Sequence, residues 1–426
     1  MKLSSLIGHV TELYAEVLIS PKPADRLIDV FFRERKYLGS KDRRFISETL
    51  YGILRNKRKI ELSFNDIDEK RTSLFSCTAY LLMDKKYAVD LLSTEVDIPI
   101  DTIARIEQNI NSNLAVGSSV EAVALHYSFQ DWMIQEWIEY FGSSEVTSLC
   151  TTLNTQAPMT LRVNTIKTTV EDCQRKMESE GIETEKAKYS PYALHLKKRI
   201  NVFQSQVFKD GLFEVQDEGS QLLAMLVDPK PKSKVLDACA GAGGKALAMA
   251  SIMNNRGEIF AFDIHSFRLD ELKKRIRRSG VDTIRTKAIR ENEVEEGFIG
   301  AADFVLVDAP CTGTGTIRRN PGMKWSVTEQ MVRELCEKQL SILSFNSQYV
   351  KVGGRLVYAT CSLIKDENEN VVELFLSKEK NFELVNPSSI LERYNLAGMT
   401  DNKYFQLLPH KFNTDGFFAA VMKRVS

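Results

Sequence analysis

The sequence predicts an α/β fold in which a doubly wound, mostly parallel sheet follows a small α+β domain and an amino-terminal all-α domain. In the carboxyl-terminal half, near-continuous apolar runs alternate with amphipathic stretches, which is typical of a sheet covered by helices on both faces. In the first 125 residues, apolar residues instead recur at three- and four-residue spacing, which is typical of helices. A chain of 426 residues also exceeds what one hydrophobic core usually organises, so several domains are expected.

Three domains are predicted, at residues 1–125, 126–215 and 216–426. The helical spacing of the first is clearest in ADRLIDVFFRERKYLG and DRRFISETLYGILRNKRKIE, and the stretch NLAVGSS marks its end. In the second, MTLRVN predicts a strand and VEDCQRKMESEG predicts an amphipathic helix that ends at Gly181. We interpret this second domain as a small α+β linking domain.

The third domain is predicted to contain six strands separated by amphipathic helices: residues 234–239, 258–264, 283–289, 303–310, 353–361 and 416–424. In sheets of this type, ligands bind at the carboxyl ends of the strands. We therefore expect the functional residues where these strands end.

Basic residues are unevenly distributed although the net charge is zero. Residues 21–60 hold twelve Lys or Arg against five acids, and residues 264–290 hold nine against three. Patches of this kind suit a polyanion such as nucleic acid. Solvated helix faces explain them at least as well when they are taken alone.

The cysteines and histidines argue against a disulfide-rich or a metal-binding protein. The seven cysteines form no C-x-x-C pair and the five histidines are scattered, so we expect neither a disulfide framework nor a metal. No apolar run approaches the roughly 18 residues of a membrane span. Polar residues also interrupt the opening stretch, MKLSSLIGHVTELYAEVLI. We expect a soluble, cytoplasmic protein.

A glycine-rich turn, LDACAGAGGKA (236–246), follows the first predicted strand. A dinucleotide fingerprint requires G-x-G-x-x-G, and a P-loop requires Gly at position 239 and Ser or Thr at position 246. The chain has Cys239 and Ala246, so neither motif fits. Asp263 ends the second strand, where an acid commonly binds ribose hydroxyls. Together these features indicate an adenosyl group without a pyrophosphate, and a purely structural turn is the alternative.

Two cysteines follow the fourth and fifth strands, in DAPCTGTG (308–315) and ATCSL (359–363). Both are expected at the same edge of the sheet, beside the crevice of the glycine turn. Carbon 5 of cytosine becomes nucleophilic after a thiolate adds to carbon 6, and the reaction further needs a donor to the ring and a base. Cys361, Asp308 and Cys311 are the candidates for these roles. An Asp308 that donates has to be protonated, which requires a dry pocket.

The alternative for any single cysteine is that it packs as a small hydrophobic residue. We expect this for four of them, and for Cys239 packing is favoured over chemistry. The four are Cys77, Cys150, Cys173 and Cys336.

Five stretches resemble the signatures of the Sun/Nop/RsmB-type family of RNA (cytosine-5) methyltransferases: VQDEGSQL, LDACAGAGGK, DAPCTGTGTIRRNPGMKW, ATCSL and HKFNTDGFFAAVMKR. The resemblance covers roughly residues 126–426. It implies a Rossmann-like class I methyltransferase sheet, an RRM-like linking domain that binds RNA and, more loosely, a NusB-like helical domain at residues 1–125.

The resemblance also implies a reaction and its site. Cys361 would attack the base, Cys311 would assist product release, and Lys245 and Asp308 would line the target-base pocket. The cofactor would be S-adenosylmethionine and the partner RNA, ribosomal rather than transfer RNA, with no membrane or metal and with a monomeric protein. The residues expected to bind the cofactor are Ala238, Cys239, Ala240, Gly241, Gly243, Gly244, Lys245, Asp263, Arg268 and Asp308.

Two departures from the family pattern concern the cofactor. The chain has Ala242 where the family usually has Pro, and TKAIREN (286–292) lacks the usual acid that holds the adenine amino group. We expect weaker cofactor binding, or a substitute acid at Glu291 or Glu293. Three basic residues in the loop after the fourth strand are candidates for phosphate contacts, with unpartnered surface charges as the alternative: Arg318, Arg319 and Lys324.

Three other functions compete with this hypothesis. An RNA-binding ribosome-assembly factor would keep the fold with weak or no catalysis, but it has no need of both cysteines and Asp308. A transfer-RNA cytosine-5 methyltransferase would use the same residues. A DNA cytosine methyltransferase shares the covalent chemistry, but the enzymes of that kind place their nucleophile in the Pro-Cys motif, and here a Thr-Cys motif is present as well.

Overall fold

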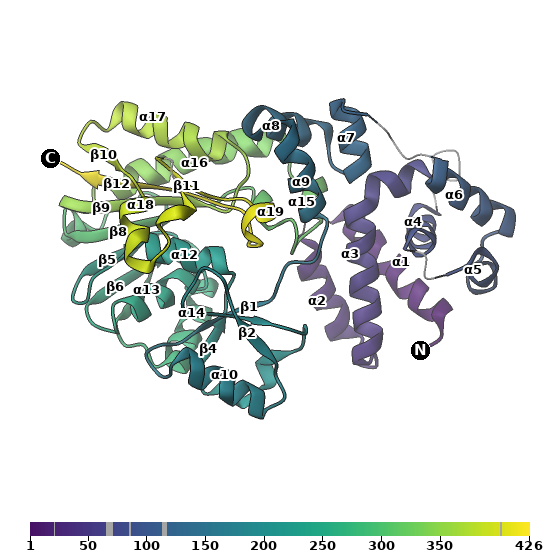
Figure 1. Cartoon of the computed structure of the whole chain (residues 1–426), viewed down its shortest axis with the longest axis horizontal. Coiled ribbons are helices and arrows are strands. Elements are labelled where there is room, and N and C mark those ends of the chain that lie inside the picture. Colours follow the sequence, from purple (N-terminus) through teal and green to yellow (C-terminus); the bar gives the residue numbers. More distant parts are fainter. Residues whose placement is uncertain (21, 65–70, 85–86, 113–116, 401–402) are drawn as a thin grey trace. The chain divides into compact units, whose positions relative to one another are not determined.

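The computed structural model describes residues 1–20, 22–64, 71–84, 87–112, 117–400 and 403–426. The chain forms two compact units (Figure 1). One comprises Met1–Gln156 together with Ile317–Glu329, and the other comprises Ala157–Thr316 together with Gln330–Ser426.

The first unit is built of helices, as the spacing of its apolar residues predicts, and α1 to α6 share one apolar core. In α3, Ile46, Leu50 and Ile53 lie on one face and are completely buried. Its helices are α1 Leu3–Ile19, α2 Ala24–Glu34, α3 Ser40–Leu62, α4 Thr72–Met83, α5 Val89–Glu95, α6 Ile100–Ser112, α7 Val120–Tyr127, α8 Asp131–Phe141, α9 Ser143–Leu153 and α15 Met323–Ser326.

The end of this unit bears on the predicted domain limits. Helices α7 to α9 belong to it, and it ends at Gln156. The predicted boundary segment NLAVGSS begins in residues 113–116, which lie outside the described part of the chain. The division at residue 125 stays a prediction.

The segment Ile317–Glu329 is anchored in this unit by a buried lysine. The Nζ atom of Lys324 donates to the carbonyl oxygens of Arg55 at 2.8 Å and Tyr127 at 3.2 Å, and to Asn154 Oδ1 at 2.8 Å. Lys324 is 0% exposed, and burial lowers its pKa well below the ordinary value. The expectation that Lys324 contacts phosphate is therefore wrong, because its amino group is buried and donates to three acceptors inside the protein.

The second unit begins with a small antiparallel sheet in the order β2-β3-β1-β4. The strand and helix predicted from MTLRVN and VEDCQRKMESEG are confirmed as β1 and α10. Its apolar core includes Leu161, Met177 and Phe213. Its elements are β1 Thr160–Val163, α10 Val170–Ser179, β2 Thr184–Lys186, β3 Ala193–Leu196, α11 Gln206–Lys209 and β4 Phe213–Val215.

The large sheet has the order β10-β12-β9-β8-β5-β6-β7, with β11 paired to β12. Strands β5 to β9 pair in parallel, whereas β12 runs antiparallel to β9 and β10. This confirms the predicted doubly wound fold. The strands are β5 Lys234–Asp237, β6 Glu258–Asp263, β7 Ile284–Ala288, β8 Ala302–Asp308, β9 Val350–Thr360, β10 Phe382–Val385, β11 Phe405–Leu407 and β12 Phe417–Arg424.

Helices cover both faces of this sheet (Figure 1). Alternate residues of β9 enter different cores: Val357 packs with α12 to α14, and Leu356 packs with α16 and α17. Both faces are therefore dry, which explains the continuous apolar runs in the sequence. The helices are α12 Glu218–Val227, α13 Gly244–Ile252, α14 Ser266–Ser279, α16 Glu329–Ser347, α17 Val371–Lys378, α18 Ser388–Leu391 and α19 Pro409–Phe412.

The basic run 264–290 is largely paired within the chain. Glu214, which is buried in β4, accepts from Arg275 Nε at 3.1 Å and from Arg278 Nη2 at 2.6 Å, so α14 is held to the small sheet. Three more lysines of this run form ion pairs: Lys273 with Asp270, Lys274 with Glu271, and Lys287 with Glu295. Arg275 and Arg278 of this predicted polyanion patch therefore serve the fold, while Lys273 and Lys274 form their pairs at the solvent-exposed surface.

Candidate active site

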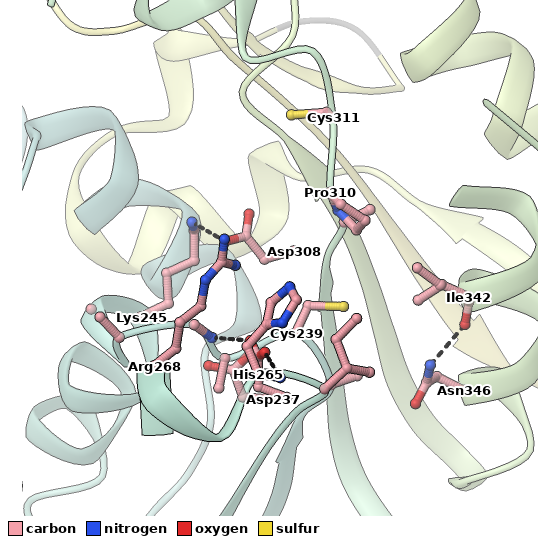
Figure 2. Close-up of a pocket in the computed structure, with 18 of the residues that line it drawn as sticks. Asp237, Cys239, Lys245, His265, Arg268, Asp308, Pro310, Cys311, Ile342 and Asn346 are labelled. Carbon is pink, nitrogen blue, oxygen red and sulfur yellow. Dashed lines mark hydrogen bonds and ion pairs between the residues drawn. The ribbon is translucent and has the colours of Figure 1, made fainter. Parts of the chain in front are cut away.

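A cavity of about 720 Å³ lies at the carboxyl ends of β5, β6 and β8. Strand β5 stands between β6 and β8, which is the point where the strand order reverses and where such sheets bind ligands. Asp237, Cys239 and Lys245 lie on one side and Ile342 and Asn346 of α16 on the other (Figure 2). Of the residues predicted for the site, all line this cavity except Gly243.

The glycine turn is fixed by Asp263 at the end of β6. Asp263 Oδ2 accepts from the Gly241 backbone N–H at 2.8 Å, and Oδ1 accepts from that of His265 at 2.7 Å. Each oxygen keeps a second lone pair, which is free to accept from a ligand hydroxyl. Arg275 Nη1 donates to the carbonyl of Ala242 at 2.7 Å, so α14 holds the position where the family usually has Pro.

Gly243 serves the turn rather than the cavity. Its φ of +79° lies in the left-handed region, and it caps the start of α13. A Cβ atom at this position would lie 2.1 Å from Leu272 Cδ1 of α14. The glycine is therefore required by helix packing and backbone conformation, and its predicted contact with a cofactor stays a prediction.

Asp237, the last residue of β5, is a member of the site that the sequence analysis missed. It lines the cavity, is 1% exposed, and neither carboxylate oxygen has a hydrogen-bond partner among the described residues. Burial, then the negative charges of Asp308 and Asp263, raise the pKa of Asp237 to about 7, whereas the positive charge of Lys245 and the backbone of Cys239 lower it. Its position in the sequence could have indicated this role, because Asp237 ends a strand just as Asp263 and Asp308 do.

Lys245 and Asp308 form an ion pair inside the cavity, with 2.6 Å between Nζ and Oδ2 (Figure 2). Burial opposes the charge of Lys245, but Asp308 outweighs it and raises the pKa of the ammonium above its ordinary value. A donating Asp308 would require a dry pocket, but its side chain is 29% exposed and faces the Lys245 ammonium, so the cavity does not provide that condition. Lys245 is thus the proton-bearing member of this pair.

The two cysteines of the strand ends meet, as their positions after β8 and β9 predict. The distance between Cys311 Sγ and Cys361 Sγ is 3.4 Å, and both residues line the cavity. The hydrogen bond to Cys361, together with burial and the charge of Cys361, raises the pKa of the Cys311 thiol well above its ordinary value. The two thiols are therefore placed to exchange a proton, and which of them is the nucleophile stays a prediction.

The wall opposite the glycine turn comes from α16, which no sequence motif indicated as part of the site. Its Lys338 pairs with Glu291 at 2.6 Å, and both line the cavity. Glu293, the other candidate for the missing adenine acid, accepts from the Arg290 backbone N–H at 2.9 Å and does not line the cavity. Of the two, Glu291 is placed to meet a ligand.

The cysteines expected to pack do so. Cys77, Cys150 and Cys173 are completely buried, and burial raises the pKa of each thiol to about 12. Cys336 is partly buried against the core under α16. Within the described ranges, no cluster of three His, Cys, Asp or Glu is placed to hold a metal ion. No helix there is both long and apolar enough to cross a membrane.

Comparisons with known proteins point to a methyltransferase family. A family model described as 16S rRNA methyltransferase RsmB/F matches residues 224–423, and one described as an RsmF/B-like ferredoxin-like domain matches residues 129–203. The probable ribosomal RNA small subunit methyltransferase B of Bacillus subtilis is 30% identical over 91% of this chain and 92% of its own length.

Two further similarities point the same way. The 25S rRNA (cytosine-C(5))-methyltransferase nop2 of Schizosaccharomyces pombe is 28% identical over 78% of this chain and 58% of its own length. The crystal structure of a methyltransferase homologue from Pyrococcus horikoshii superposes with a TM-score of 0.61 at 26% identity, covering 72% of this chain and all of that one. The chain belongs to the RsmB/F family of rRNA methyltransferases.

Proposed function

We propose that this protein methylates carbon 5 of a cytosine in ribosomal RNA, with S-adenosylmethionine as the methyl donor and Cys361 as the covalent nucleophile. The observation that carries the proposal is the pair of thiols 3.4 Å apart in a cavity that also contains the glycine turn. The names of the small-subunit and 25S (cytosine-C(5)) relatives support the substrate and the methylated atom.

The residues present fit the proposed cofactor. The unpaired, buried carboxylate of Asp237 suits the ammonium group of an amino acid, and Asp263 suits ribose hydroxyls. Glu291 is the acid that would take the adenine amino group. When bound, S-adenosylmethionine supplies an electrophilic methyl group on a sulfonium. The absent pyrophosphate cradle agrees with this choice over a dinucleotide.

Cys361 starts the proposed reaction as a thiolate stabilised by the Cys311 S–H, 3.4 Å away. Its sulfur forms a bond to carbon 6 of cytosine, and the electron pair that moves onto the ring makes carbon 5 nucleophilic. Lys245, held by Asp308, is the nearby cation that can donate to the ring as charge builds there. Lys245 thus takes over the donor role that the sequence analysis gave to Asp308.

The same pair of thiols explains the release step. Once Cys361 is a thioether it carries no charge, so its charge no longer raises the pKa of Cys311, while burial and the charge of Glu367 still do. Cys311 then loses its proton to solvent and, as a thiolate, removes the proton from carbon 5. The bond between carbon 6 and Cys361 breaks, and Cys361 leaves as a thiolate.

The predicted domain roles belong to this proposal. Residues 216–426 catalyse, residues 126–215 bind RNA, and the helical residues 1–125 select the RNA through the basic run 21–60. The double variant Lys36→Glu, Lys41→Glu, which changes two exposed residues of that run, should change which RNA is methylated while cofactor binding persists. Unchanged RNA choice in a filter-binding competition would contradict the role of the helices.

The reaction is tested by incubating unmodified RNA with the purified protein and isotope-labelled S-adenosylmethionine, followed by mass spectrometry of the nucleosides. We expect labelled 5-methylcytidine, lost in Cys361→Ser. Competition between an RNA and the same sequence as DNA separates the two nucleic acids, and parallel ribosomal and transfer RNA separate those substrates. No label in any nucleoside despite measured cofactor binding would favour an assembly factor.

A further inference from the structure

A buried carboxylate lies behind the two cysteines and outside the cavity. Glu367 sits on the π-helical turn Asp366–Asn370, is 0% exposed, and has no ion-pair partner among the described residues. Its Oε1 accepts from the Thr312 backbone N–H at 2.8 Å and from Gln339 Nε2 at 2.9 Å. Its Oε2 accepts from the hydroxyls of Thr312 and Ser362. Every contact thus uses the carboxylate as an acceptor.

These contacts join the two cysteine-bearing loops. Thr312 follows Cys311, and Ser362 follows Cys361, so one carboxylate holds the residue after each thiol. Because Glu367 is buried, a shift of either loop would break hydrogen bonds that water is not present to replace.

The residues before the two cysteines are held by neighbours of the same carboxylate. Gln339, which donates to Glu367, also donates to the Pro310 carbonyl at 3.0 Å. Asn368 accepts from the Thr360 hydroxyl and donates to the Ser362 carbonyl at 3.0 Å. Each cysteine is therefore fixed on both sides by one network centred on the π-helical turn.

Burying an anion with no cation beside it is costly, so fold stability alone is a poor reason for Glu367. A neutral acceptor offers fewer lone pairs, and only a carboxylate accepts from four donors at once. We propose that Glu367 is a positioning residue that sets the distance between the Cys311 and Cys361 sulfurs. This rests on the proposed function, in which both thiols act in turn on one base.

The spacing of the thiols can be measured without RNA or cofactor. Diamide takes two electrons and two protons from two thiols and leaves a disulfide, at a rate that depends on the thiolate fraction and on how often the sulfurs meet. The charge of Glu367 raises the pKa of Cys311, so its removal alone would speed the oxidation, and a slower oxidation therefore reports the spacing of the sulfurs. We would treat the full-length protein with diamide and quantify the Cys311–Cys361 disulfide by peptide mass spectrometry. Glu367→Ala is compared with Asp366→Ala, which removes an exposed acid from the same turn.

Glu367→Ala should form this disulfide at least about tenfold more slowly. A tenfold change corresponds to about 1.4 kcal/mol, which is about the contribution of one hydrogen bond to a charged group. Glu367→Gln should recover part of the rate, since the Thr312 and Ser362 hydroxyls can rotate to accept its amide hydrogens. Asp366→Ala should match the wild type. With RNA, Glu367→Ala should lower kcat while the KM for RNA and the cofactor Kd change little, because Glu367 does not line the cavity.

Wild-type disulfide rates in a folded Glu367→Ala protein would overturn the proposal, as would an equal slowing in Asp366→Ala. If Glu367→Ala fails to fold, the disulfide rates of Glu367→Gln and Thr312→Val decide. Slower disulfide formation in both variants supports the proposal, and wild-type rates in both overturn it. A wild-type protein that makes no 5-methylcytidine would instead refute the proposed function, because the disulfide measurement needs neither RNA nor cofactor.

Discussion

Two buried carboxylates, Asp237 and Glu367, differ in how their oxygens are satisfied. Asp237 is 1% exposed, lines the cavity and has no hydrogen-bond partner among the described residues. Glu367 is 0% exposed, lies off the cavity and accepts from a backbone amide, a side-chain amide and two hydroxyls. An unsatisfied carboxylate in a cavity is available to a ligand, whereas a satisfied one holds the protein itself.

The largest stability effect is expected at the satisfied carboxylate. Glu367→Ala leaves the Thr312 backbone N–H and the Gln339 amide unpaired in a dry site, so it should lower the free energy of unfolding by about 4 kcal/mol. Urea denaturation at pH 7 measures this change. A loss below about 1 kcal/mol would show that the network is not held by this carboxylate.

Replacing the unsatisfied carboxylate of Asp237 should have the opposite effect and raise the free energy of unfolding. Asp237 has a pKa of about 7 in the folded protein against 3.8 ordinarily, so the folded state keeps a proton that the unfolded state loses. Its contribution to stability is fully present below pH 3.8 and is lost as the pH rises through 7. Asp237→Asn should therefore stabilise the protein at pH 8, on the order of 3 kcal/mol, and bind S-adenosylmethionine more weakly.

Urea denaturation of this variant at pH 4 and pH 8, with calorimetric cofactor titrations, provides the check. At pH 4 the two proteins should be nearly equally stable. A variant that is less stable than the wild type at pH 8 would contradict the assignment of Asp237 as an unpaired acid that is available to bind a cationic group.

The glycine turn sharpens the comparison, because it depends on packing rather than on a carboxylate. Gly243→Ala meets both a left-handed φ and the Leu272 side chain, so it should destabilise by about 2 kcal/mol. Gly241→Ala has a φ of +55° but no atom within 4 Å of the added Cβ, and should cost about 1 kcal/mol. Equal melting temperatures for the two variants would exclude the clash with Leu272.

The smallest effect is expected for Asp366→Asn. This acid precedes Glu367 on the same turn but is exposed, and its recorded contact is with the exposed Asn370. The variant should change the free energy of unfolding by about 0.5 kcal/mol or less. A loss as large as that of Glu367→Ala in the same urea series would mean that the turn itself, and not the buried carboxylate, holds the cysteine loops.

The sequence predicts the sheet well because its central strands are buried on both faces. The run GGRLVYATC corresponds to β9, which extends from Val350 to Thr360, and KVLDAC to β5. Strands β10 and β11 are not predicted, since FELV and FQL are short and Glu383 and Gln406 interrupt them, so neither shows a continuous apolar run. They are placed by their pairing with β12.

The site is predicted where its residues follow a strand, and missed where it depends on distant contacts. Cys311 and Cys361 are found because parallel strands end at one edge of the sheet. The role of Glu367 and the depth of Lys324 cannot be read locally: the first requires Thr312 and Gln339, and the second requires Asn154. An isolated charged residue in a loop reads as exposed until its partners are known.

The most direct test of the proposed reaction uses Cys311→Ala with RNA and S-adenosylmethionine. If Cys361 attacks and Cys311 releases, this variant should accumulate a protein–RNA complex that survives denaturing electrophoresis, with the RNA bound to the Cys361 peptide in mass spectrometry. The double variant Cys311→Ala, Cys361→Ala should give none. A Cys311→Ala protein that turns over normally without a stable adduct would contradict the assigned roles of the two thiols.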